Sequence, residues 1–442
     1  GVTQSFSAIN AIHMAWIEAS TATRGTVFTG GSTPVYEVLY ARSEDNGATF
    51  TTPVSVSGGR SYFVLSTAGS GSSLSTLDLE VDSGGNPRVA YAFVTTADRS
   101  ANRNVYFGYS SDGGDSWKTP LAVNDVSVVG TEGAKSAFPR MIIDDRDEIF
   151  IAYERGTSGT GDIMLAKVNR STSTFTMETF GSLGTAGSAG GVRITADAKR
   201  HNGVDLALGD GDALHAVYFS DADNRIEHKR LSTDDLWSTV GATGWNQNVD
   251  GATVGAFVDE VSGNAALDVN ANYYFPTIVV DRQPVPDRVF SVFKFGDNTP
   301  TEGIYFNQYV DDGSTGAGAT WGVASTVWSS GETPLFADGL GKYGPELNWS
   351  HTERVAAFVD DVVEDVRGDL HIAFSAGFSG STADEHDIYY ATYNGSSWTL
   401  PEVVADDDSD GAGTDDGIAN TDTYLGSPAL THHPGADHLY LA

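Results

Sequence analysis

The sequence predicts an all-β protein in which one small antiparallel sheet is repeated along the chain. Runs of four to seven β-branched and aromatic residues alternate with clusters of Gly, Ser, Thr and Asp, and 51 of the 442 residues are glycine. This is the pattern of short strands joined by tight turns. A five-residue pattern that begins apolar and ends aromatic also recurs. Its copies are residues 12–16, 89–93, 149–153, 214–218, 289–293 and 370–374.

Each copy belongs to a module of four strands. A second β-rich run follows it, and then a turn leads to an aromatic residue. These aromatics are Phe50, Trp117, Phe175, Trp237, Trp321 and Trp398. Many copies also have an earlier strand that ends in Asp or Gly. Four-stranded antiparallel sheets that recur at such a period predict a β-propeller, in which neighbouring sheets bury each other's faces.

We expect a single propeller domain over residues 1–442, with six recognisable modules and a partial seventh, so that it is six- or seven-bladed. The modules cover approximately 1–58, 75–125, 135–182, 203–242, 272–329, 353–405 and, for the partial one, 424–442. Three arrangements of the last module stay open. It closes the ring with the N-terminal strand, it continues in a longer polypeptide, or it accepts a strand from a neighbouring molecule and so drives self-assembly.

Two of the turns share the pattern S-x-D-x-G-x-[ST]-[WF]. The residues are Ser43, Asp45, Gly47, Thr49 and Phe50 in the first, and Ser110, Asp112, Gly114, Ser116 and Trp117 in the second. We expect the Asp to accept hydrogen bonds from backbone amides and the Gly to take a positive φ. The hydroxyl groups satisfy further backbone groups, and the aromatic ring packs between sheets.

These two turns resemble the Asp-box, or BNR, repeat of sialidase-like β-propellers. The resemblance implies that both turns are structural and lie on the outer rim. It also makes glycoside hydrolysis the first activity to consider. A sialidase would carry a Phe/Tyr-Arg-Ile-Pro motif, three arginines that clasp a carboxylate, a Tyr/Glu nucleophile pair and an Asp acid/base. The sequence has only a scrambled string, Phe-Pro-Arg-Met at 138–141, which favours the start of a strand. No catalytic residue is identified.

The chain is strongly acidic, with 59 Asp and Glu against 25 Lys and Arg and a formal charge of −34. Such a field repels phosphate backbones, so we expect no nucleic-acid partner. No apolar run is long enough for a membrane span. The absence of cysteine excludes disulfides, thiolate catalysis and Cys-ligated zinc. The acidic surface suits a medium rich in salt or divalent cations.

One acidic segment has the spacing of a calcium loop. Asp406, Asp408 and Asp410 alternate and are followed by Gly411, as in loops that present successive carboxylates to one Ca²⁺ ion. The twelfth position, where such a loop has Glu, is Gly417, so Asp415 or Asp416 would have to complete the shell. The alternative is a solvated acidic linker. Calcium is the only cofactor that the sequence indicates, and no organic cofactor is expected.

Taken together, these patterns favour a non-catalytic propeller outside the cell or on its surface, which binds glycans or surface proteins or helps to build a surface layer. The competing hypothesis is a secreted glycoside hydrolase or lyase with its site at the centre of the propeller. Acidic residues are too numerous for the sequence to single out one catalytic carboxylate pair.

Overall fold

Strands make up all of the regular secondary structure in the part of the chain that the computed structural model describes. The described residues are 2–6, 11–20, 35–58, 77–94, 103–124, 135–157, 160–170, 175–177, 192–195, 201–209, 213–220, 225–232, 259–260, 273–281, 287–295, 303–311, 321, 325–329, 345–346, 356–359, 369–378, 386–405, 430–433 and 438–441. Among them, no helix is long and apolar enough to cross a membrane.

The strands form seven antiparallel sheets, numbered here in chain order. Sheet 1 holds β1 (Val2–Phe6), β2 (Ile12–Ser20), β3 (Val35–Ser43) and β4 (Val54–Ser55). Sheet 2 holds β5 (Leu77–Val81), β6 (Pro87–Val94), β7 (Arg103–Tyr109) and β8 (Leu121–Ala122). Sheet 3 holds β9 (Lys135–Ile143), β10 (Ile149–Thr157), β11 (Thr160–Arg170), β12 (Phe175–Met177) and β13 (Val192–Arg193).

The remaining sheets follow the same plan. Sheet 4 holds β14 (His201–Leu208), β15 (Ala213–Ser220), β16 (Arg225–Ser232) and β17 (Asp259–Glu260). Sheet 5 holds β18 (Tyr273–Asp281), β19 (Asp287–Phe295), β20 (Gly303–Asp311) and β21 (Ser325–Ser329). Sheet 6 holds β22 (Pro345–Glu346), β23 (Ala356–Val359), β24 (Leu370–Phe378), β25 (His386–Tyr393) and β26 (Glu402–Ala405), and sheet 7 holds β27 (Leu430–His433) and β28 (His438–Leu441).

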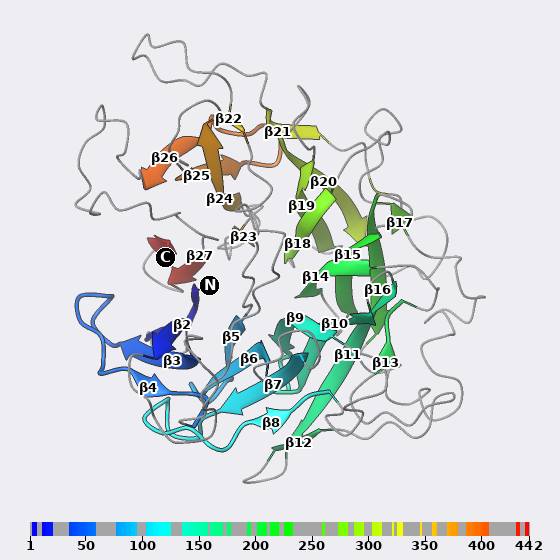
Figure 1. Cartoon of the computed structure of the whole chain (residues 1–442). Coiled ribbons are helices and arrows are strands. Elements are labelled where there is room, and N and C mark those ends of the chain that lie inside the picture. Colours follow the sequence, from blue (N-terminus) through cyan, green and yellow to red (C-terminus); the bar gives the residue numbers. More distant parts are fainter. Residues whose placement is uncertain are drawn as a thin grey trace.

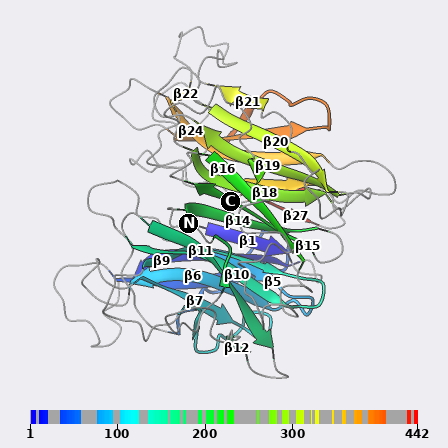
Figure 2. The same ribbon diagram turned by 90° about the vertical axis from the view of Figure 1, so that its right-hand side faces the viewer.

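The seven sheets stand around a common centre, as the sequence predicts for a β-propeller (Figure 1). Their inner strands touch one another in the order β1, β5, β9, β14, β18, β23 and β27, and β27 returns to β1. Figure 2 shows inner strands such as β1, β9 and β14 running roughly along the line of sight of Figure 1, and therefore along the central axis. The last module thus takes a place in the ring between sheets 6 and 1.

Apolar side chains fill the spaces between consecutive sheets. The second strands contribute the largest share of these buried side chains, because neighbouring sheets cover both of their faces. Every residue of β15 is buried. Five buried clusters occupy the five spaces from sheet 1 to sheet 6. Representative pairs across them are Val38 with Leu79, Phe107 with Ile151, Leu165 with Leu214, Val217 with Val289, and Val292 with Ile372.

In sheets 2, 3, 5 and 6 the aromatic residue after the outer turn packs in one direction, onto the third strand of the preceding sheet. Trp117 of sheet 2 lies edge-on to Tyr40 on β3, with ring centroids 5.1 Å apart. The same contact joins Phe175 to Tyr109 at 4.7 Å, Trp321 to His228 at 5.2 Å and Trp398 to Phe306 at 5.2 Å. These rings therefore connect neighbouring sheets at the outer side of the buried clusters: Phe175 and Trp321 belong to them, and Trp117 and Trp398 pack against them.

Strand register corrects one copy of the five-residue repeat. The residue that pairs with the end of the inner strand is Ile149 in sheet 3 and Leu214 in sheet 4, as the sequence pattern predicts. In sheet 2 it is Pro87, which pairs with Val81, so the equivalent copy is 87–91 and not 89–93. Small and apolar residues alternate along β6, so the sequence pattern fits the copies 87–91 and 89–93 equally well. The correction places Arg88 at the position that His13, Phe150, His215, Phe290 and His371 hold in other sheets.

Buried His13 makes the stability of the fold depend on pH. Burial, with a smaller contribution from the nearby Arg42 charge, lowers its pKa from 6.5 to about 4, and its Nδ1 lies 2.6 Å from the Tyr40 hydroxyl. The unfolded chain therefore binds this proton more readily than the folded chain, so the contribution of His13 is present above pH 6.5 and is lost as the pH falls toward 4. His13→Phe, which copies Phe150, removes this titration.

We expect the free energy of unfolding of the unmodified chain to fall by about 2–3 kcal/mol more than that of His13→Phe between pH 7 and pH 4. Urea unfolding at a series of pH values measures the difference. Parallel curves for the two proteins would show that His13 is not held neutral by the fold.

Candidate functional site

The two motif turns have the same internal hydrogen bonds. The Ser110 hydroxyl oxygen accepts from the Gly114 amide at 2.8 Å, and Asp112 accepts from the Ser116 amide at 2.9 Å and the Ser116 hydroxyl at 2.5 Å. In the first turn, Ser43 and Asp45 accept from the corresponding groups of Gly47 and Thr49 at 2.8, 2.8 and 2.5 Å. Desolvation raises the pKa of Asp112, but the hydrogen bonds that its carboxylate accepts from Ser116 and Ser110 outweigh it and lower this pKa to about 2.

The turn of sheet 2 is also bonded to sheet 1. Tyr40 donates its hydroxyl proton to the Gly113 carbonyl at 3.3 Å, and the Arg42 guanidinium donates to the same carbonyl at 2.7 Å and to Asp115 at 2.9 Å. Gly114 has a φ of +99°. These bonds hold sheets 1 and 2 together at the rim.

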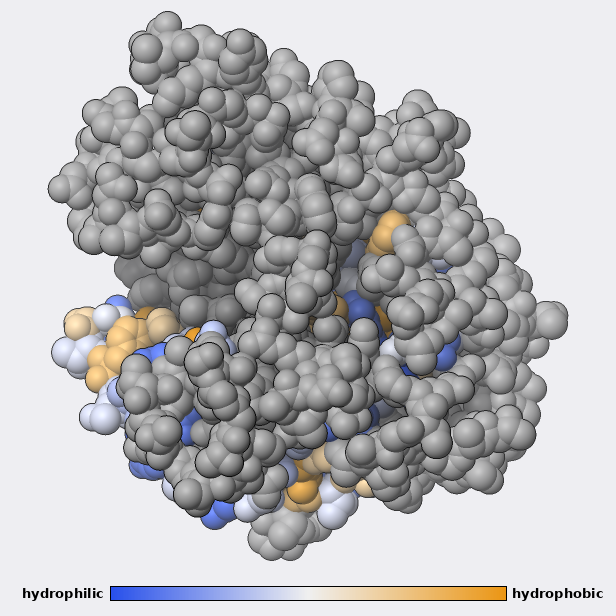
Figure 3. All heavy atoms as spheres, in the orientation of Figure 1, coloured by the Kyte–Doolittle hydropathy of each residue, from blue (hydrophilic) through white to orange (hydrophobic). Residues whose placement is uncertain are grey.

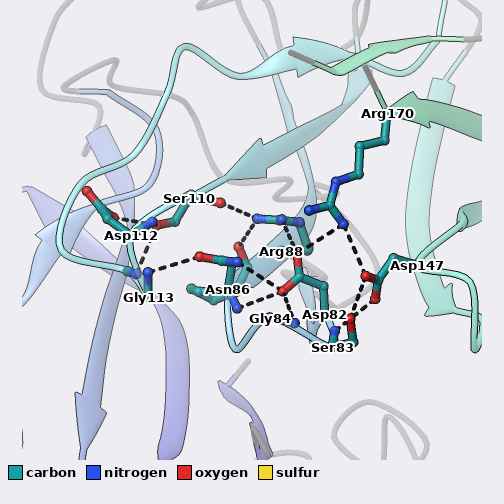
Figure 4. A network of polar contacts seen from close by, with 12 residues as sticks. Asp82, Ser83, Gly84, Asn86, Arg88, Ser110, Asp112, Gly113, Asp147 and Arg170 are labelled. Carbon is teal, nitrogen blue, oxygen red and sulfur yellow. Dashed lines mark hydrogen bonds and ion pairs between the residues drawn. The ribbon is translucent and has the colours of Figure 1, made fainter. Parts of the chain in front are cut away.

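A second polar network joins the inner turn of sheet 2 to sheet 3 (Figure 4). Asp82 is ion-paired with the buried Arg88, whose guanidinium also donates to the Ser110 carbonyl. Asp147, in the β9–β10 turn, accepts from the Ser83 amide at 2.8 Å and from Arg170 at 3.1 Å. The acidic run at 144–148 is therefore a turn between strands, and it connects sheet 3 to sheet 2.

The predicted calcium ligands Asp406, Asp408, Asp410, Asp415 and Asp416 lie outside the described residues. Within the part of the chain that the structure describes, no group of three or more His, Asp or Glu side chains is arranged to hold a metal ion.

The innermost strands bring together a different set of charged residues. Asp78 and Glu80 alternate along β5 and therefore point to the same face. The opposite face, with Leu77 and Leu79, packs into the cluster between sheets 1 and 2. Asp78 and Glu80 thus face sheet 3, and Asp78 Oδ2 accepts from the Met141 amide on β9 at 2.7 Å.

Arg140 on β9 links two carboxylates from different sheets. Its Nη1 lies 3.7 Å from Asp78 Oδ1, and its Nε lies 3.5 Å from Asp205 Oδ1 on β14. The three side chains are 13–18% exposed, so the pairs are shielded but not sealed from water. Asp205 Oδ2 accepts from the Ile278 amide on β18 at 3.0 Å, which fixes its orientation.

These residues hold equivalent positions in three consecutive sheets. Asp82, Asp144 and Gly209 each begin the turn after the inner strand, because each of their amides bonds the carbonyl at the start of the second strand. Asp78, Arg140 and Asp205 each lie four residues earlier. Equivalent positions come close together on the innermost strands, where the ring is narrowest.

Glu80 has a strongly shifted proton affinity. It is partly buried, and burial together with the negative charges of Asp78 and Asp205 raises its pKa from 4.5 to about 8. A carboxyl group with this pKa is largely protonated at neutral pH and can donate a proton. A proton donor next to carboxylates that are held by an arginine is an arrangement suited to acid–base chemistry.

Sequence reasoning did not single out this site. Asp78, Glu80 and Asp205 were among many acidic residues, and the string at 138–141 was interpreted only as the start of a strand. It lies inside β9, where it supplies Arg140. The available signal was a charged residue four positions before a strand-ending Asp or Gly, in "LDLEVD", "RMIIDD" and "DLALGD".

Among known proteins, only solved structures are similar to this chain. No protein-family model matches the chain, and no curated protein does. An α-L-arabinanase of Penicillium chrysogenum complexed with arabinobiose has a TM-score of 0.45 and 9% identity, over 89% of this chain and 92% of that one. A GH93 α-L-arabinofuranosidase of Fusarium graminearum has a TM-score of 0.45 and 12% identity, over 82% and 85%.

An intramolecular trans-sialidase of Ruminococcus gnavus is also similar, with a TM-score of 0.41 and 9% identity over 84% of this chain and 89% of that one. At such identities and TM-scores, these likenesses carry no weight for what this chain binds or does. The resemblance of the two turns to Asp-boxes therefore stays a resemblance based on their residues.

The equivalent glycines of the two turns allow a matched test of rim packing. Both have positive φ, +85° for Gly47 and +99° for Gly114. Among the described residues, a Cβ on Gly47 would meet Ile12 Cδ1 at an ordinary contact distance of 3.5 Å, whereas one on Gly114 would overlap the ring of Tyr40. We expect Gly47→Ala to cost about 1–2 kcal/mol through backbone strain and Gly114→Ala to cost roughly 2 kcal/mol more through the clash. Equal losses in chemical denaturation would refute the tight packing of this turn on Tyr40.

Proposed function

We propose that the chain is a glycan-binding β-propeller that hydrolyses glycosidic bonds at the centre of its ring, with Glu80 as the proton donor. The observation that carries this proposal is the group formed by Asp78, Glu80, Asp205 and Arg140 on three inner strands. It combines a carboxyl group that stays protonated near neutral pH with two carboxylates whose positions are fixed by backbone amides and by Arg140.

In this proposal each residue of the group has a separate role in the reaction. Glu80 gives its proton to the glycosidic oxygen as the bond to the anomeric carbon breaks. Water adds to that carbon, and a carboxylate, Asp78 or Asp205, takes the proton that the water loses. Arg140 holds both carboxylates in place. The acidic composition supports a place outside the cell or on its surface, in a medium where salt screens the charge.

A second candidate is glycan binding without turnover. One observation favours it: Asp78 and Asp205 each use an oxygen to accept an amide of the next sheet's inner strand. In that role they support the ring, and the inner polar residues provide hydrogen bonds to a sugar. Saturable binding of a glycan without release of product, in the unmodified chain, would favour this candidate.

Turnover of a panel of neutral oligosaccharides, arabino-oligosaccharides and sialosides tests the hydrolytic proposal. We expect Glu80→Gln to lower kcat by at least about 100-fold, because the amide cannot donate the proton. Glu402→Gln, a change at an exposed glutamate on β26, is the matched control and should leave the rate unchanged. If the whole panel stays intact with the unmodified chain, or if Glu80→Gln turns over at the full rate, the proposal is wrong.

The raised pKa of Glu80 also predicts how the rate of hydrolysis and the stability of the fold depend on pH. Its folded pKa lies above its unfolded value, so the rate should fall as the pH rises through about 8. By the same linkage Glu80 lowers the stability of the fold as the pH rises from 4.5 to 8. Glu80→Gln should therefore be more stable than the unmodified chain by about 4 kcal/mol at pH 8 and by little at pH 4. Thermal melts at the two pH values measure this difference independently of activity.

A further inference from the structure

The chain contains three Asn-Gly pairs, which are Asn46-Gly47, Asn202-Gly203 and Asn394-Gly395. In such a pair the backbone nitrogen of the glycine can attack Cγ of the asparagine side chain and close a cyclic imide. Glycine favours this step because it has no Cβ to obstruct the approach. The reaction needs a glycine nitrogen that is available to attack, and the structure distinguishes the three pairs on this point.

Two of the glycine amides are held by hydrogen bonds. The Gly47 amide donates to the Ser43 hydroxyl at 2.8 Å, inside the motif turn of sheet 1. The Gly203 amide on β14 donates to the Glu154 carboxylate on β10 at 2.5 Å. Each bond must break before the nitrogen attacks, and this raises the barrier of the reaction.

The third pair lies in the outer turn of sheet 6, at the place that Asn46-Gly47 holds in sheet 1. Gly395 precedes Trp398 by the same number of residues as Gly47 precedes Phe50. The two glycines also share their backbone conformation, with φ of +86° and +85°. The two pairs are therefore matched in position and in local geometry.

The sheet 6 turn is shorter and lacks the serine. Tyr393 stands directly after Thr392, whose carbonyl closes the turn, where Ser43 stands after Arg42 in sheet 1. The serine hydroxyl that holds the glycine nitrogen in sheet 1 thus has no counterpart at this position of sheet 6. Within the described part of the chain, the Gly395 amide donates no hydrogen bond.

The side chain of Asn394 is held over its own turn by its oxygen. Its Oδ1 accepts from the Ser396 amide at 3.0 Å, the Ser396 hydroxyl at 2.8 Å and the Ser397 amide at 3.0 Å. When the glycine nitrogen attacks Cγ, negative charge develops on this oxygen. Donors that already point at it stabilise that charge.

Solvent exposure does not separate the two matched pairs, because Asn46 and Asn394 are both exposed. Phe50 at the end of the sheet 1 turn is 42% exposed, although the sequence predicts that it packs between sheets, whereas Trp398 packs against sheet 5. Figure 3 shows hydrophilic and apolar residues at the surface on the side of the molecule where sheet 1 lies. Water thus reaches the sheet 1 turn at least as easily.

We propose that Asn394-Gly395 is a self-modification site, at which the folded chain converts Asn394 to aspartate and isoaspartate without an enzyme. The Gly395 nitrogen forms a bond to Cγ, and its proton goes to the side-chain nitrogen, which leaves as ammonia. Water then opens the cyclic imide at one of its two carbonyl groups. One opening gives aspartate and the other gives isoaspartate. The inference is independent of the proposed activity.

The modified turn lies at the contact between sheets 5 and 6. A Cβ on Gly395 would meet Arg288 Nη1 of sheet 5 at 3.5 Å, so the new carboxylate forms beside an arginine. Isoaspartate also inserts an additional carbon into the main chain of the turn that carries Trp398, which packs on Phe306. The conversion therefore changes both the charge and the backbone of this contact.

Peptide mapping by mass spectrometry tests the proposal on the unmodified, folded chain during incubation in mildly alkaline buffer. We expect Asn394 to convert at least about 10-fold faster than Asn46, since the loss of one hydrogen bond to the attacking nitrogen corresponds to about this factor. Both aspartate and isoaspartate should form. In urea that unfolds the chain, the rates at Asn394, Asn46 and Asn202 should become similar, because the bonds that hold the glycine amides are lost.

Ser43→Ala tests the protection of the matched pair. It frees the Gly47 amide, so conversion of Asn46 should rise by about 10-fold. Asn202 and Asn394 in the same molecules should keep their rates, which shows that the variant is folded. The comparison within the unmodified chain decides the proposal even where Ser43→Ala does not fold.

Equal rates at Asn394 and Asn46 in the folded chain overturn the proposal. A product that contains aspartate without isoaspartate overturns it too, since direct hydrolysis of the side chain would then replace the cyclic imide. A folded Ser43→Ala chain in which Asn46 reacts no faster contradicts the role given to the glycine amide.

Discussion

The ring depends on a single directional contact, repeated from sheet to sheet: an aromatic side chain at an outer turn packs on the third strand of the sheet before it. Apolar clusters between sheets supply most of the burial, but they are broad and tolerate small shifts. The edge-on rings, at centroid distances of 4.7–5.2 Å, set how far each sheet is turned from its neighbour. In sheets 2, 3, 5 and 6 the contact runs backwards along the chain, from an outer turn to the third strand of the sheet before it.

The same repetition has opposite effects at the centre and at the rim. At the rim, equivalent residues of different sheets lie far apart, so hydroxyl and carboxylate groups serve their own turns. At the centre the inner strands converge, and one repeated position places Asp78, Arg140 and Asp205 within reach of each other. Burial, together with the charges of Asp78 and Asp205 gathered in this way, raises the pKa of Glu80, which opposes folding at neutral pH. Glu80 therefore lowers the free energy of unfolding at neutral pH, and the packing of the sheets gives no reason to keep it. This favours a catalytic role for Glu80.

The sequence predicted the strands, the antiparallel modules and the turns, since these follow from local patterns of apolar residues, glycine and hydroxyl groups. The internal bonding of Asp45 and Asp112 could be anticipated for the same reason. The central site could not be predicted, because Asp78, Arg140 and Asp205 lie more than 60 residues apart and meet only when the ring closes. The exposure of Phe50 was equally out of reach, since its motif is intact and only the place of its sheet beside sheet 7 distinguishes it. The register of residues 87–91 was misjudged because small and apolar residues alternate there.

A double-mutant cycle at one rim contact tests the directional packing most directly. Phe306→Leu, Trp398→Leu and the double variant would be unfolded in urea and their free energies compared. Because the two rings touch across the space between sheets 5 and 6, directional packing predicts a coupling energy of about 1 kcal/mol. Strictly additive losses would contradict it, since they would mean that the aromatic turns do not hold neighbouring sheets together.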